Sequence, residues 1–323
     1  MSDEIQSSPN PGRDSSPPIV EFRSVSKWYG QVIGLNNLTL RLPSGVTGLL
    51  GPNGSGKSTL LQLATGQLRP SQGEVRVLDH RPWNEPGLNR YLGLCPEQDA
   101  FFEWMTGRAF LVNCGLLAGL GRRAAPEAAE RALEKVNMTA AADRPIRGYS
   151  KGMRQRIKLA QAIVHDPIVL FLDEPLTGTD PVARRELIDA IIDWGSHGRT
   201  VLVSSHVFHE VQAVTRSIVL LNRGRLVAQG DVRQIRDLID EHPHRIVLKS
   251  PRVRDLAAEL VQHDDVVGVE FRRDDGAIVV ETRVPDRFYS RLVDLALDGR
   301  TPIDEVYSDD DSLEAVFNYL VPT

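Results

Sequence analysis

Near the start of the chain, the order of apolar and polar positions predicts three strands and a helix. Residues 19–25 and 35–42 alternate apolar and polar side chains, which is typical of strands with one buried face. Residues 46–50 form a short apolar run instead, which indicates a strand covered on both faces. After a glycine-rich turn, leucines recur at helical spacing, at Leu60, Leu61, Leu63 and Leu68.

The middle of the chain continues this alternation of strands and helices. Residues 168–172 and 200–203 are short apolar runs that read as buried strands, and 157–163 has helical spacing. Helical signals also occupy 110–120 and 126–136. This order predicts an α/β fold with a mixed sheet core and a helical insertion.

The last part of the chain predicts a small α+β unit. Its pattern reads strand, helix, strand, strand, helix, strand, over 245–249, 253–262, 266–272, 277–283, 287–297 and 303–307. That βαββαβ order is the ferredoxin-like arrangement, with Asp274, Asp275 and Gly276 as the turn of the central hairpin. A final amphipathic helix over 312–320, with Leu313, Val316, Phe317 and Leu320 on one face, is expected to pack on this same unit.

Composition and charge exclude several classes of protein. The 323 residues are 41% hydrophobic and 25% charged, as in ordinary globular domains, which excludes wholesale disorder, collagen and a coiled-coil rod. The two cysteines, Cys95 and Cys114, are too few for a disulfide framework or a cysteine-rich metal site. A net charge of -5 provides no global basic field, so no nucleic-acid partner is expected.

The chain divides by composition into a tail and two domains. Residues 1–18 are polar and rich in proline and serine, without the apolar run of a secretory signal, and are expected to be a disordered tail. No stretch is long and apolar enough to predict a membrane helix. Residues 245–323 carry 17 acidic and 10 basic side chains, whereas 1–244 carry 26 and 28. The expected domains are therefore 19–240 and 245–323, separated by a short linker.

The glycine-rich turn matches the phosphate-binding P-loop pattern GxxxxGK[ST], and it lies between the predicted strand 46–50 and a helix, as that motif requires. Glycines let backbone N–H groups surround phosphate oxygens, a lysine contributes a point charge, and a serine hydroxyl can bind Mg²⁺. The residues assigned to nucleotide binding are Gly51, Pro52, Asn53, Gly54, Ser55, Gly56, Lys57, Ser58 and Thr59, and Ser58 is also assigned to the metal.

Two acids follow the buried strand 168–172. Asp173 and Glu174 would lie at the carboxyl edge of a parallel sheet, which is where ligands bind in such folds. Asp173 is expected to hold Mg²⁺ directly or through water, and Glu174 is expected to orient and polarise the attacking water. The alternative is an ordinary strand end whose acids cap the next turn.

A third motif decides the family. Residues 149–156 read Tyr-Ser-Lys-Gly-Met-Arg-Gln-Arg and open the helical run 157–163, with Ser150 as a natural N-cap. The sequence resembles the ATPase subunit of ABC transporters. The resemblance is carried by four features in this order: a P-loop, a helical insertion, the S-x-G-x-x-Q-R motif, and a run of hydrophobic residues followed by Asp-Glu. The resemblance covers about residues 19–235 and implies ATP and Mg²⁺ as cofactors.

The resemblance also assigns roles to single residues. Tyr29 would stack on adenine, Asp180 would be the acidic residue of the D-loop, and His206 would be the switch histidine that contacts the γ-phosphate. Ser150, Lys151 and Gly152, in the signature, would contact the nucleotide of a second subunit. Each has a structural alternative: a packed aromatic residue for Tyr29, a helix start for Asp180, and a structural histidine for His206.

The chain departs from the family pattern at two places. Tyr149, Lys151 and Met153 replace residues of the usual Leu-Ser-Gly-Gly-Gln signature, and this form resembles the subset that serves ABC-2 type exporters. The Q-loop position falls on Glu97, with Gln98 as the alternative. The helical subdomain is placed at about 99–165. Its aromatic residues Phe101, Phe102 and Trp104 form either a docking groove for a membrane subunit or a small local core.

The resemblance implies an ATP-hydrolysing subunit that energises an ABC-2 type exporter when ATP drives two copies together. Its partners would be an integral membrane permease and a second ATPase subunit, with a homodimer favoured, and it would lie at the cytoplasmic face of the membrane. One alternative is an ABC-type ATPase that acts on a non-membrane partner such as the ribosome. Another is a nucleotide-sensing module without catalysis, which the presence of Glu174 and His206 disfavours.

Overall fold

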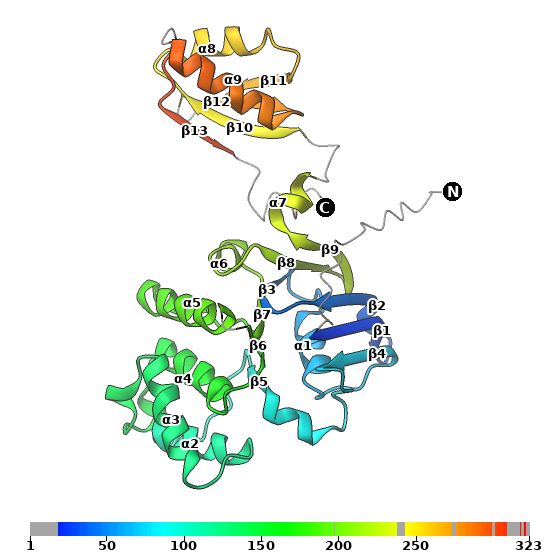
Figure 1. Ribbon diagram of the computed structural model, residues 1–323, viewed down its shortest axis with the longest axis vertical. Coiled ribbons are helices and arrows are strands. Elements are labelled where there is room, and N and C mark those ends of the chain that lie inside the picture. The colour runs from blue at the N-terminus through cyan, green and yellow to red at the C-terminus, as the bar shows by residue number, and fades with distance from the viewer. Residues whose placement is uncertain are drawn as a thin grey trace.

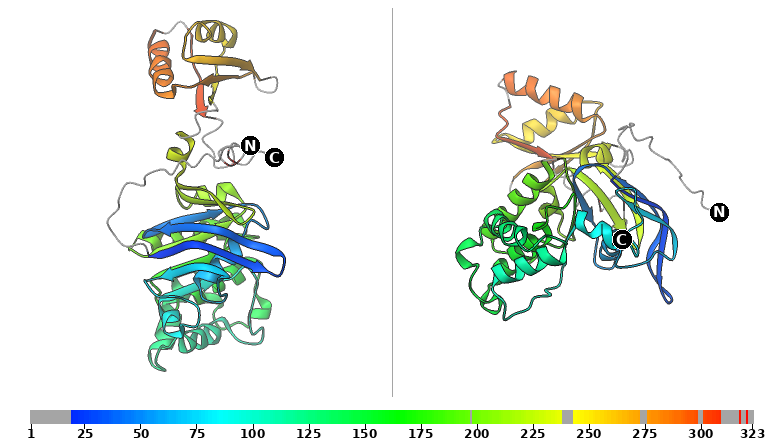
Figure 2. Two further views of the ribbon diagram at one scale, coloured as in Figure 1. Left: turned by 90° about the vertical axis from the view of Figure 1, so that its right-hand side faces the viewer. Right: turned by 60° about the horizontal axis from the view of Figure 1, so that its bottom comes forward.

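The described part of the chain folds around three sheets, one of them in a separate C-terminal unit (Figures 1 and 2). The computed structural model describes residues 19–196, 198–237, 243–272, 276–298, 301–308, 317 and 320. The expected tail over 1–18 therefore lies outside the described residues, as do Asp274 and Asp275 of the expected hairpin turn.

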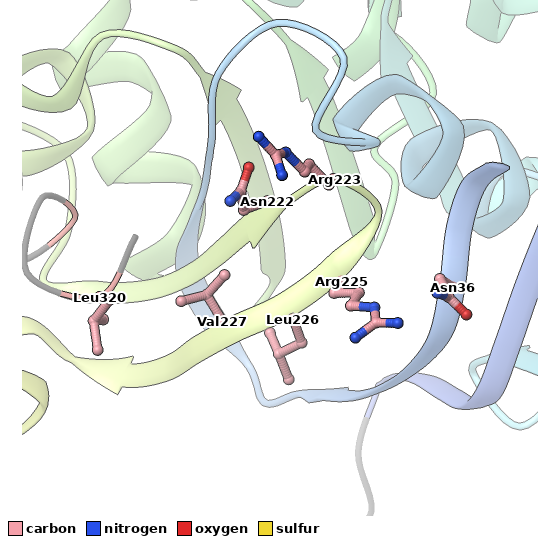
Figure 3. A pocket seen from close by; sticks show the side chains of 7 residues that line it. All are labelled: Asn36, Asn222, Arg223, Arg225, Leu226, Val227 and Leu320. Carbon is pink, nitrogen blue, oxygen red and sulfur yellow. The ribbon is translucent and has the colours of Figure 1, made fainter. Parts of the chain in front are cut away.

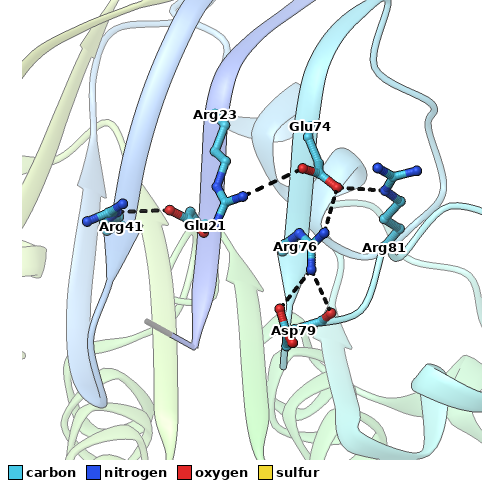
Figure 4. Close-up of polar contacts among 7 residues, drawn as sticks. All are labelled: Glu21, Arg23, Arg41, Glu74, Arg76, Asp79 and Arg81. Atoms are coloured by element: carbon cyan, nitrogen blue, oxygen red, sulfur yellow. Dashed lines mark hydrogen bonds and ion pairs between the residues drawn. The ribbon is translucent and has the colours of Figure 1, made fainter. Parts of the chain in front are cut away.

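The first sheet is antiparallel, in the order β2-β1-β4. Its strands are β1 (Val20–Tyr29), β2 (Val32–Leu42) and β4 (Gln72–Val77). The alternation seen at 19–25 and 35–42 is confirmed as one buried and one polar face, and both strands extend further toward the hairpin between them. The polar face carries a chain of ion pairs, shown in Figure 4, among Glu21, Arg23, Arg41, Glu74, Arg76, Asp79 and Arg81. Two of these pairs, Arg23–Glu74 and Arg41–Glu21, connect neighbouring strands. Opposite charges on neighbouring strands support this register without a second apolar layer.

The second sheet has the order β5-β6-β7-β3-β8-β9. Its strands are β3 (Gly45–Leu50), β5 (Leu92–Cys95), β6 (Val169–Asp173), β7 (Thr200–Ser205), β8 (Ser217–Asn222) and β9 (Arg225–Asp231), and only β9 is antiparallel to its neighbour. In the register of the central strands, Leu50 lies beside Ser205, and Asp173 lies beside Ser204. The carboxyl ends of β3, β6 and β7 therefore meet at one edge.

This sheet is buried on both faces, which explains its unbroken apolar runs. Val169 and Phe171 of β6 pack toward the antiparallel sheet and helix α1 (Lys57–Ala64), whereas Leu170 and Leu172 pack toward the helices on the other side. Those helices are α2 (Gly107–Leu117), α3 (Ala124–Lys135), α4 (Lys151–Ile163) and α5 (Pro181–Ser196), which appear in green in Figure 1. Two short helices, α6 (Phe208–Gln212) and α7 (Val232–Asp237), follow β7 and β9.

The C-terminal unit has the predicted βαββαβ order. Its elements are β10 (His244–Lys249), α8 (Val253–Leu260), β11 (Val266–Phe271), β12 (Ile278–Thr282), α9 (Pro285–Asp298) and β13 (Glu305–Ser308). The sheet order is β11-β12-β10-β13 and every pair is antiparallel, as a ferredoxin-like unit requires. Its core contains Leu256, Leu260, Phe288 and Leu292. The predicted fold class, an α/β P-loop fold with a small α+β addition, is confirmed.

The expectation for the end of the chain is wrong. Phe317 lies against Phe208 at the start of α6, with ring centroids 5.3 Å apart, and Leu320 joins the same cluster beside Val227 and Ala228. These are residues of the first domain and not of the ferredoxin-like unit. The amphipathic pattern correctly identified an apolar face, but sequence periodicity carries no information about which surface covers that face. Leu313 and Val316 lie outside the described residues.

We predict that Phe288→Ala destabilises the C-terminal unit by about 3–5 kcal/mol, because it removes a fully buried aromatic side chain from a small core. Hydrogen exchange of the α8, β10 and β12 amides would measure the loss of protection. The matched control is Tyr289→Ala on the next residue, whose side chain is 38% exposed and should cost little. Equal effects of the two substitutions would contradict this account of the core.

Candidate nucleotide-binding and catalytic site

A cavity of about 450 Å³ lies where the carboxyl ends of β3, β6 and β7 meet. Its walls come from five parts of the chain: the first hairpin, the P-loop, the loop after β5, the end of β6 with the turn that follows it, and the segment after β7. The lining residues are Tyr29, Val32, Ile33, Gly34, Asn53, Gly54, Ser55, Gly56, Lys57, Ser58, Thr59, Glu97, Asp173, Glu174, Thr177 and His206. Most residues assigned to the nucleotide from the sequence are thus brought together.

The P-loop has the backbone geometry that phosphate binding needs. Gly51 has φ +154 and Gly56 has φ +105, and a Cβ at Gly56 would lie only 2.6 Å from Gly34 O. Only glycine fits such positions, and a glycine-rich turn of this kind can present backbone N–H groups to phosphate oxygens. Gly56 is also the N-cap of α1, whose N-terminus adds partial positive charge at the same place.

Lys57 lies in the centre of the polar groups and is 7% exposed. Its Nζ donates to Gly51 O at 2.8 Å and lies 3.8 Å from Glu174 Oε1. Burial lowers the pKa of the Lys57 ammonium below the usual range of lysine, and the carboxylates of Glu174, Asp173 and Glu97 oppose that shift. The site therefore holds a desolvated cation where phosphate oxygens would neutralise it.

The two acids at the end of β6 share one partner, Ser204, and Glu174 has a further contact with His206. Ser204 on the neighbouring strand donates its hydroxyl to Asp173 Oδ1 at 2.5 Å and accepts from the Glu174 amide at 3.1 Å. His206 Nδ1 lies 2.9 Å from Glu174 Oε1. Glu174 has φ +50, a conformation that costs energy for a residue with a Cβ and that clusters at functional sites. Asp173, Glu174 and His206 therefore form one constellation, as expected from the sequence.

The remaining wall of the cavity is apolar. Tyr29 is 45% exposed, and its hydroxyl lies 3.4 Å from Thr59 Oγ1. Val32 and Ile33, on the next strand, line the same side. Tyr29 is therefore not a packed core residue, and its ring is available to a planar ligand.

The structure distinguishes the two candidates in the loop after β5. Both residues are exposed, but Glu97 lines the cavity and Gln98 is not among the lining residues. The loop is fixed in place by the fully buried side chain of Lys158 on α4, whose Nζ donates to Glu97 O at 2.7 Å. The geometry thus favours Glu97 over Gln98 at this position.

Several assigned residues lie outside the cavity. Ser150 is confirmed as the N-cap of α4, where its hydroxyl accepts from the Met153 amide at 3.3 Å, but Ser150, Lys151 and Gly152 do not line the cavity of their own chain. Asp180 caps α5 by accepting from the Val182 and Ala183 amides, and these hydrogen bonds lower the pKa of its carboxyl. Gly51 and Pro52 support the P-loop without lining the cavity.

Two functional residues were not assigned from the sequence. Ser204 makes hydrogen bonds to both Asp173 and Glu174. The sequence feature that could have indicated this role is a hydroxyl residue at the end of a buried strand. Thr177 lines the cavity and donates its hydroxyl to Glu174 Oε2 at 3.1 Å. Neither signal is specific in sequence alone, because hydroxyl groups at strand ends and in turns usually satisfy the backbone.

The donor set fits a magnesium ion. Ser58 and Asp173 line the same cavity and offer the oxygen ligands that Mg²⁺ prefers. Within the part of the chain that the structure describes, no cluster of three or more His, Cys, Asp or Glu could hold a metal by itself. Mg²⁺ usually takes one or two protein ligands together with phosphates and water.

A second hollow, of about 600 Å³, lies beside the turn between β8 and β9 (Figure 3). Asn36, Asn222, Arg223, Arg225, Leu226, Val227 and Leu320 line it. It contains no carboxylate and no nucleophile, so it carries none of the chemistry found at the P-loop cavity.

Among the described helices, none is long and apolar enough to cross a bilayer.

Comparison with known proteins gives the class. A family model described as ABC transporter matches residues 35–177. The ABC transporter ATP-binding protein YxlF of Bacillus subtilis is 35% identical over 219 residues, which cover 68% of this chain and 72% of that protein. The daunorubicin/doxorubicin resistance ATP-binding protein DrrA of Streptomyces peucetius is 32% identical over 269 residues, 83% of this chain and 81% of DrrA.

A solved structure shows the same fold. The ATP-binding cassette MJ0796, in a dimeric post-hydrolysis state bound to ADP and Pi, aligns with a TM-score of 0.60 at 19% identity and covers 66% of this chain and 98% of that one. The chain therefore belongs to the ABC transporter family. Within that family it is an ATP-binding subunit and an ATP hydrolase, the class whose members work with membrane permease components.

We predict that ATP affinity falls as pH rises into the alkaline range, and at a lower pH than an ordinary lysine would produce. Only the protonated Lys57 attracts phosphate, and its lowered pKa brings the loss of charge to lower pH. Calorimetric titration with ATP across pH measures this. Lys57→Ala, as the control, should bind ATP weakly and without that alkaline dependence. A wild-type affinity that stays flat up to the usual range of lysine would contradict the proposed contact.

Proposed function

We propose that this protein hydrolyses ATP to energise an ABC-2 type membrane exporter, and that ATP brings two copies together to do so. The observation that carries the proposal is the separation of the site into two parts. Lys57, Asp173 and Glu174 share one cavity, whereas Ser150 lies outside it at the exposed start of α4. A capped helix start can bind an anion, and at Ser150 that anion would be the phosphate of a second copy's nucleotide.

In this proposal, each residue group has one task. The P-loop over 51–59 binds the phosphates, Tyr29 stacks on the base, and Glu97 lines the metal side of the cavity. Ser58 and Asp173 would hold Mg²⁺, which would neutralise negative charge on the phosphates when bound. Ser150, Lys151 and Gly152 of a second copy close over the γ-phosphate, and Asp180 lies in the loop at their interface.

Glu174 is the proposed catalytic base. Its Oε1 lies between Lys57 Nζ and His206 Nδ1, at 3.8 and 2.9 Å, so the carboxylate already faces the place where a γ-phosphate would lie. From there it can accept a hydrogen bond from an attacking water and polarise it. His206, which is exposed on the cavity side, provides a donor to a phosphate oxygen.

We infer a homodimer because Ser150 does not line the cavity of its own chain. Two identical chains would complete two sites by the same contact. MJ0796 was captured as a dimer bound to ADP and Pi, which supports such an arrangement for this fold. Hydrolysis would then release the two copies, and the open and closed states form a ligand-driven switch.

Two features favour export. The signature Tyr-Ser-Lys-Gly-Met is of the form that serves ABC-2 type exporters, and the relative DrrA is a drug-resistance ATP-binding protein. We place the ATPase domain at 19–240, its helical subdomain at about 99–165 and the accessory domain at 245–323. The protein would work at the cytoplasmic face of the membrane, with a permease as its partner.

The permease is proposed to dock on an aromatic patch formed by Phe102 and Trp104. Their side chains are 51% and 70% exposed with ring centroids 5.3 Å apart, whereas Phe101 turns inward onto Phe110 and belongs to the local core. Two exposed aromatic side chains side by side offer apolar surface that a partner could cover.

Side-chain contacts connect the aromatic patch to helix α4, the helix that begins with the signature motif. Arg154 on α4 makes a bidentate pair with Glu103 at 2.7 and 2.9 Å, next to the patch. Lys158, one turn later, holds Glu97 O and pairs with Asp99 at 3.3 Å. The segment from Glu97 to the patch is therefore attached to α4 at several points, and a permease that moves this segment would move Ser150 with it.

We predict that Glu174→Gln binds ATP, loses at least about a hundredfold in kcat, and accumulates as a dimer in ATP. The amide keeps the size of the side chain but cannot act as a base. Steady-state ATP hydrolysis and size-exclusion chromatography with and without ATP and Mg²⁺ measure the two effects, with the wild-type protein as control. A variant that stays monomeric in ATP would contradict the model in which ATP brings two copies together. A variant with normal ATP turnover would show that Glu174 is not the catalytic base.

We also predict that Trp104→Ala lowers recovery of an integral membrane protein with this ATPase from detergent-solubilised membranes, while leaving ATP hydrolysis by the isolated protein unchanged. The substitution removes apolar docking area without touching the cavity. Quantitative mass spectrometry of the captured membrane proteins is the measurement. Trp83→Ala, at another half-exposed tryptophan, is the matched control. Equal recovery with both variants would reject the docking patch.

A further inference from the structure

The segment between β6 and α5 contains a contact that the proposed catalytic roles do not use. Thr177 Oγ1 donates to Glu174 Oε2 at 3.1 Å. The other oxygen of the same carboxylate lies 2.9 Å from His206 Nδ1. Both oxygens of the proposed base therefore have protein partners, and Thr177 is the one that approaches from its own loop.

The position of Thr177 is set from outside that loop. Gln155, a buried residue on α4, donates its Nε2 to Thr177 O at 3.2 Å. Within the loop itself, the Thr177 amide donates to Glu174 O at 3.3 Å. The carbonyl, amide and hydroxyl groups of Thr177 are thus all hydrogen-bonded. A shift of α4 would therefore move Thr177, and with it the Glu174 carboxylate.

A second residue of α4 holds the same loop. The side chain of Lys151 lies across Gly178, and a Cβ built at Gly178 would collide with Lys151 Nζ. Gly178 has φ +71, so a side chain there would be strained as well. In this conformation Lys151 therefore covers the loop after Glu174 within its own chain. This contact is additional to the contact with phosphate that the family resemblance implies for Lys151.

These contacts connect residues that belong to two different nucleotide sites, one in the same chain and one in a second copy. The first turns of α4 carry Ser150, proposed to meet the nucleotide of a second copy, and also Lys151 and Gln155, which hold the loop of Thr177. A helix turn is rigid over this distance, so seating Ser150 on one nucleotide fixes where Thr177 places Glu174 at the other.

We propose that Thr177 is a positioning residue that fixes the Glu174 carboxylate, and that α4 sets its place through Gln155 and Lys151. The inference rests on the proposed catalytic role of Glu174 and goes beyond it by assigning what orients that residue. A hydroxyl donor on Oε2 selects one rotamer of the carboxylate and leaves Oε1 directed at the cavity.

The test is a pair of substitutions at one position. Thr177→Val keeps the shape of the side chain and removes the hydroxyl, and we expect kcat to fall about tenfold with KM for ATP and ATP-driven dimerisation unchanged, the usual effect of losing one hydrogen bond. Thr177→Ser keeps the hydroxyl and should stay within about twofold of the wild-type kcat. A kcat for Thr177→Val equal to that of the wild type, or an equal loss with both substitutions, would overturn the proposal.

A second measurement separates positioning from general damage to the fold. In a Glu174→Ala background, adding Thr177→Val should change the residual turnover no further, because the group it positions is gone. Gln155→Met should reduce kcat in the wild-type background but add nothing to Thr177→Val. Additive losses in either pair would assign Thr177 a purely structural role and overturn the inference.

These outcomes also differ from a failure of the proposed function. If Glu174→Gln keeps normal turnover, the catalytic role of Glu174 is wrong and the inference falls with it. If Glu174→Gln loses turnover while Thr177→Val keeps it, only the positioning role fails. Thermal unfolding of each variant, expected within a few degrees of the wild type, shows that the comparison is made on folded protein.

Discussion

The structure depends on one electrostatic arrangement, the buried ammonium of Lys57 beside the carboxylate of Glu174. Their charged atoms lie 3.8 Å apart at the carboxyl edge of a parallel sheet, where both side chains are largely shielded from water. An unpaired charge would be costly at such a place, and the carboxylates around Lys57 offset the cost of burying its ammonium. The same low polarity strengthens every contact that the phosphates of ATP would make there.

The edge of the sheet explains why these groups meet. Strands β3, β6 and β7 run parallel and end level with one another, so that the P-loop, Glu174 and His206 follow three adjacent strand ends. Each of these strands is buried on both faces, and its side chains pack in two separate cores that a shift in register would disrupt. The hydrophobic packing of the two cores therefore sets the polar geometry of the site.

Helix α4 connects the site to its surroundings. Its N-terminal turns carry Ser150 outward and hold the Thr177 loop through Gln155, and its next turn holds the Glu97 segment through Lys158. Lys158 is almost fully buried, so its ammonium is tied to its two partners and not to water. One rigid element thus joins the nucleotide cavity, the aromatic patch of Phe102 and Trp104, and the surface offered to a second copy.

The sequence by itself determined the strand–turn–helix of the P-loop, the acids at the end of β6, the cap at Ser150 and the βαββαβ order of the C-terminal unit. These follow from local patterns, because hydrophobic periodicity, glycine conformation and helix capping act over a few residues. The tertiary structure alone decided which distant groups meet. It placed Glu97 and not Gln98 in the cavity, turned Phe101 inward while leaving Trp104 exposed, set Phe317 against Phe208, and brought Thr177 and Ser204 to Glu174. Contacts of this kind depend on how whole elements pack against one another, and no spacing along the chain encodes that packing directly.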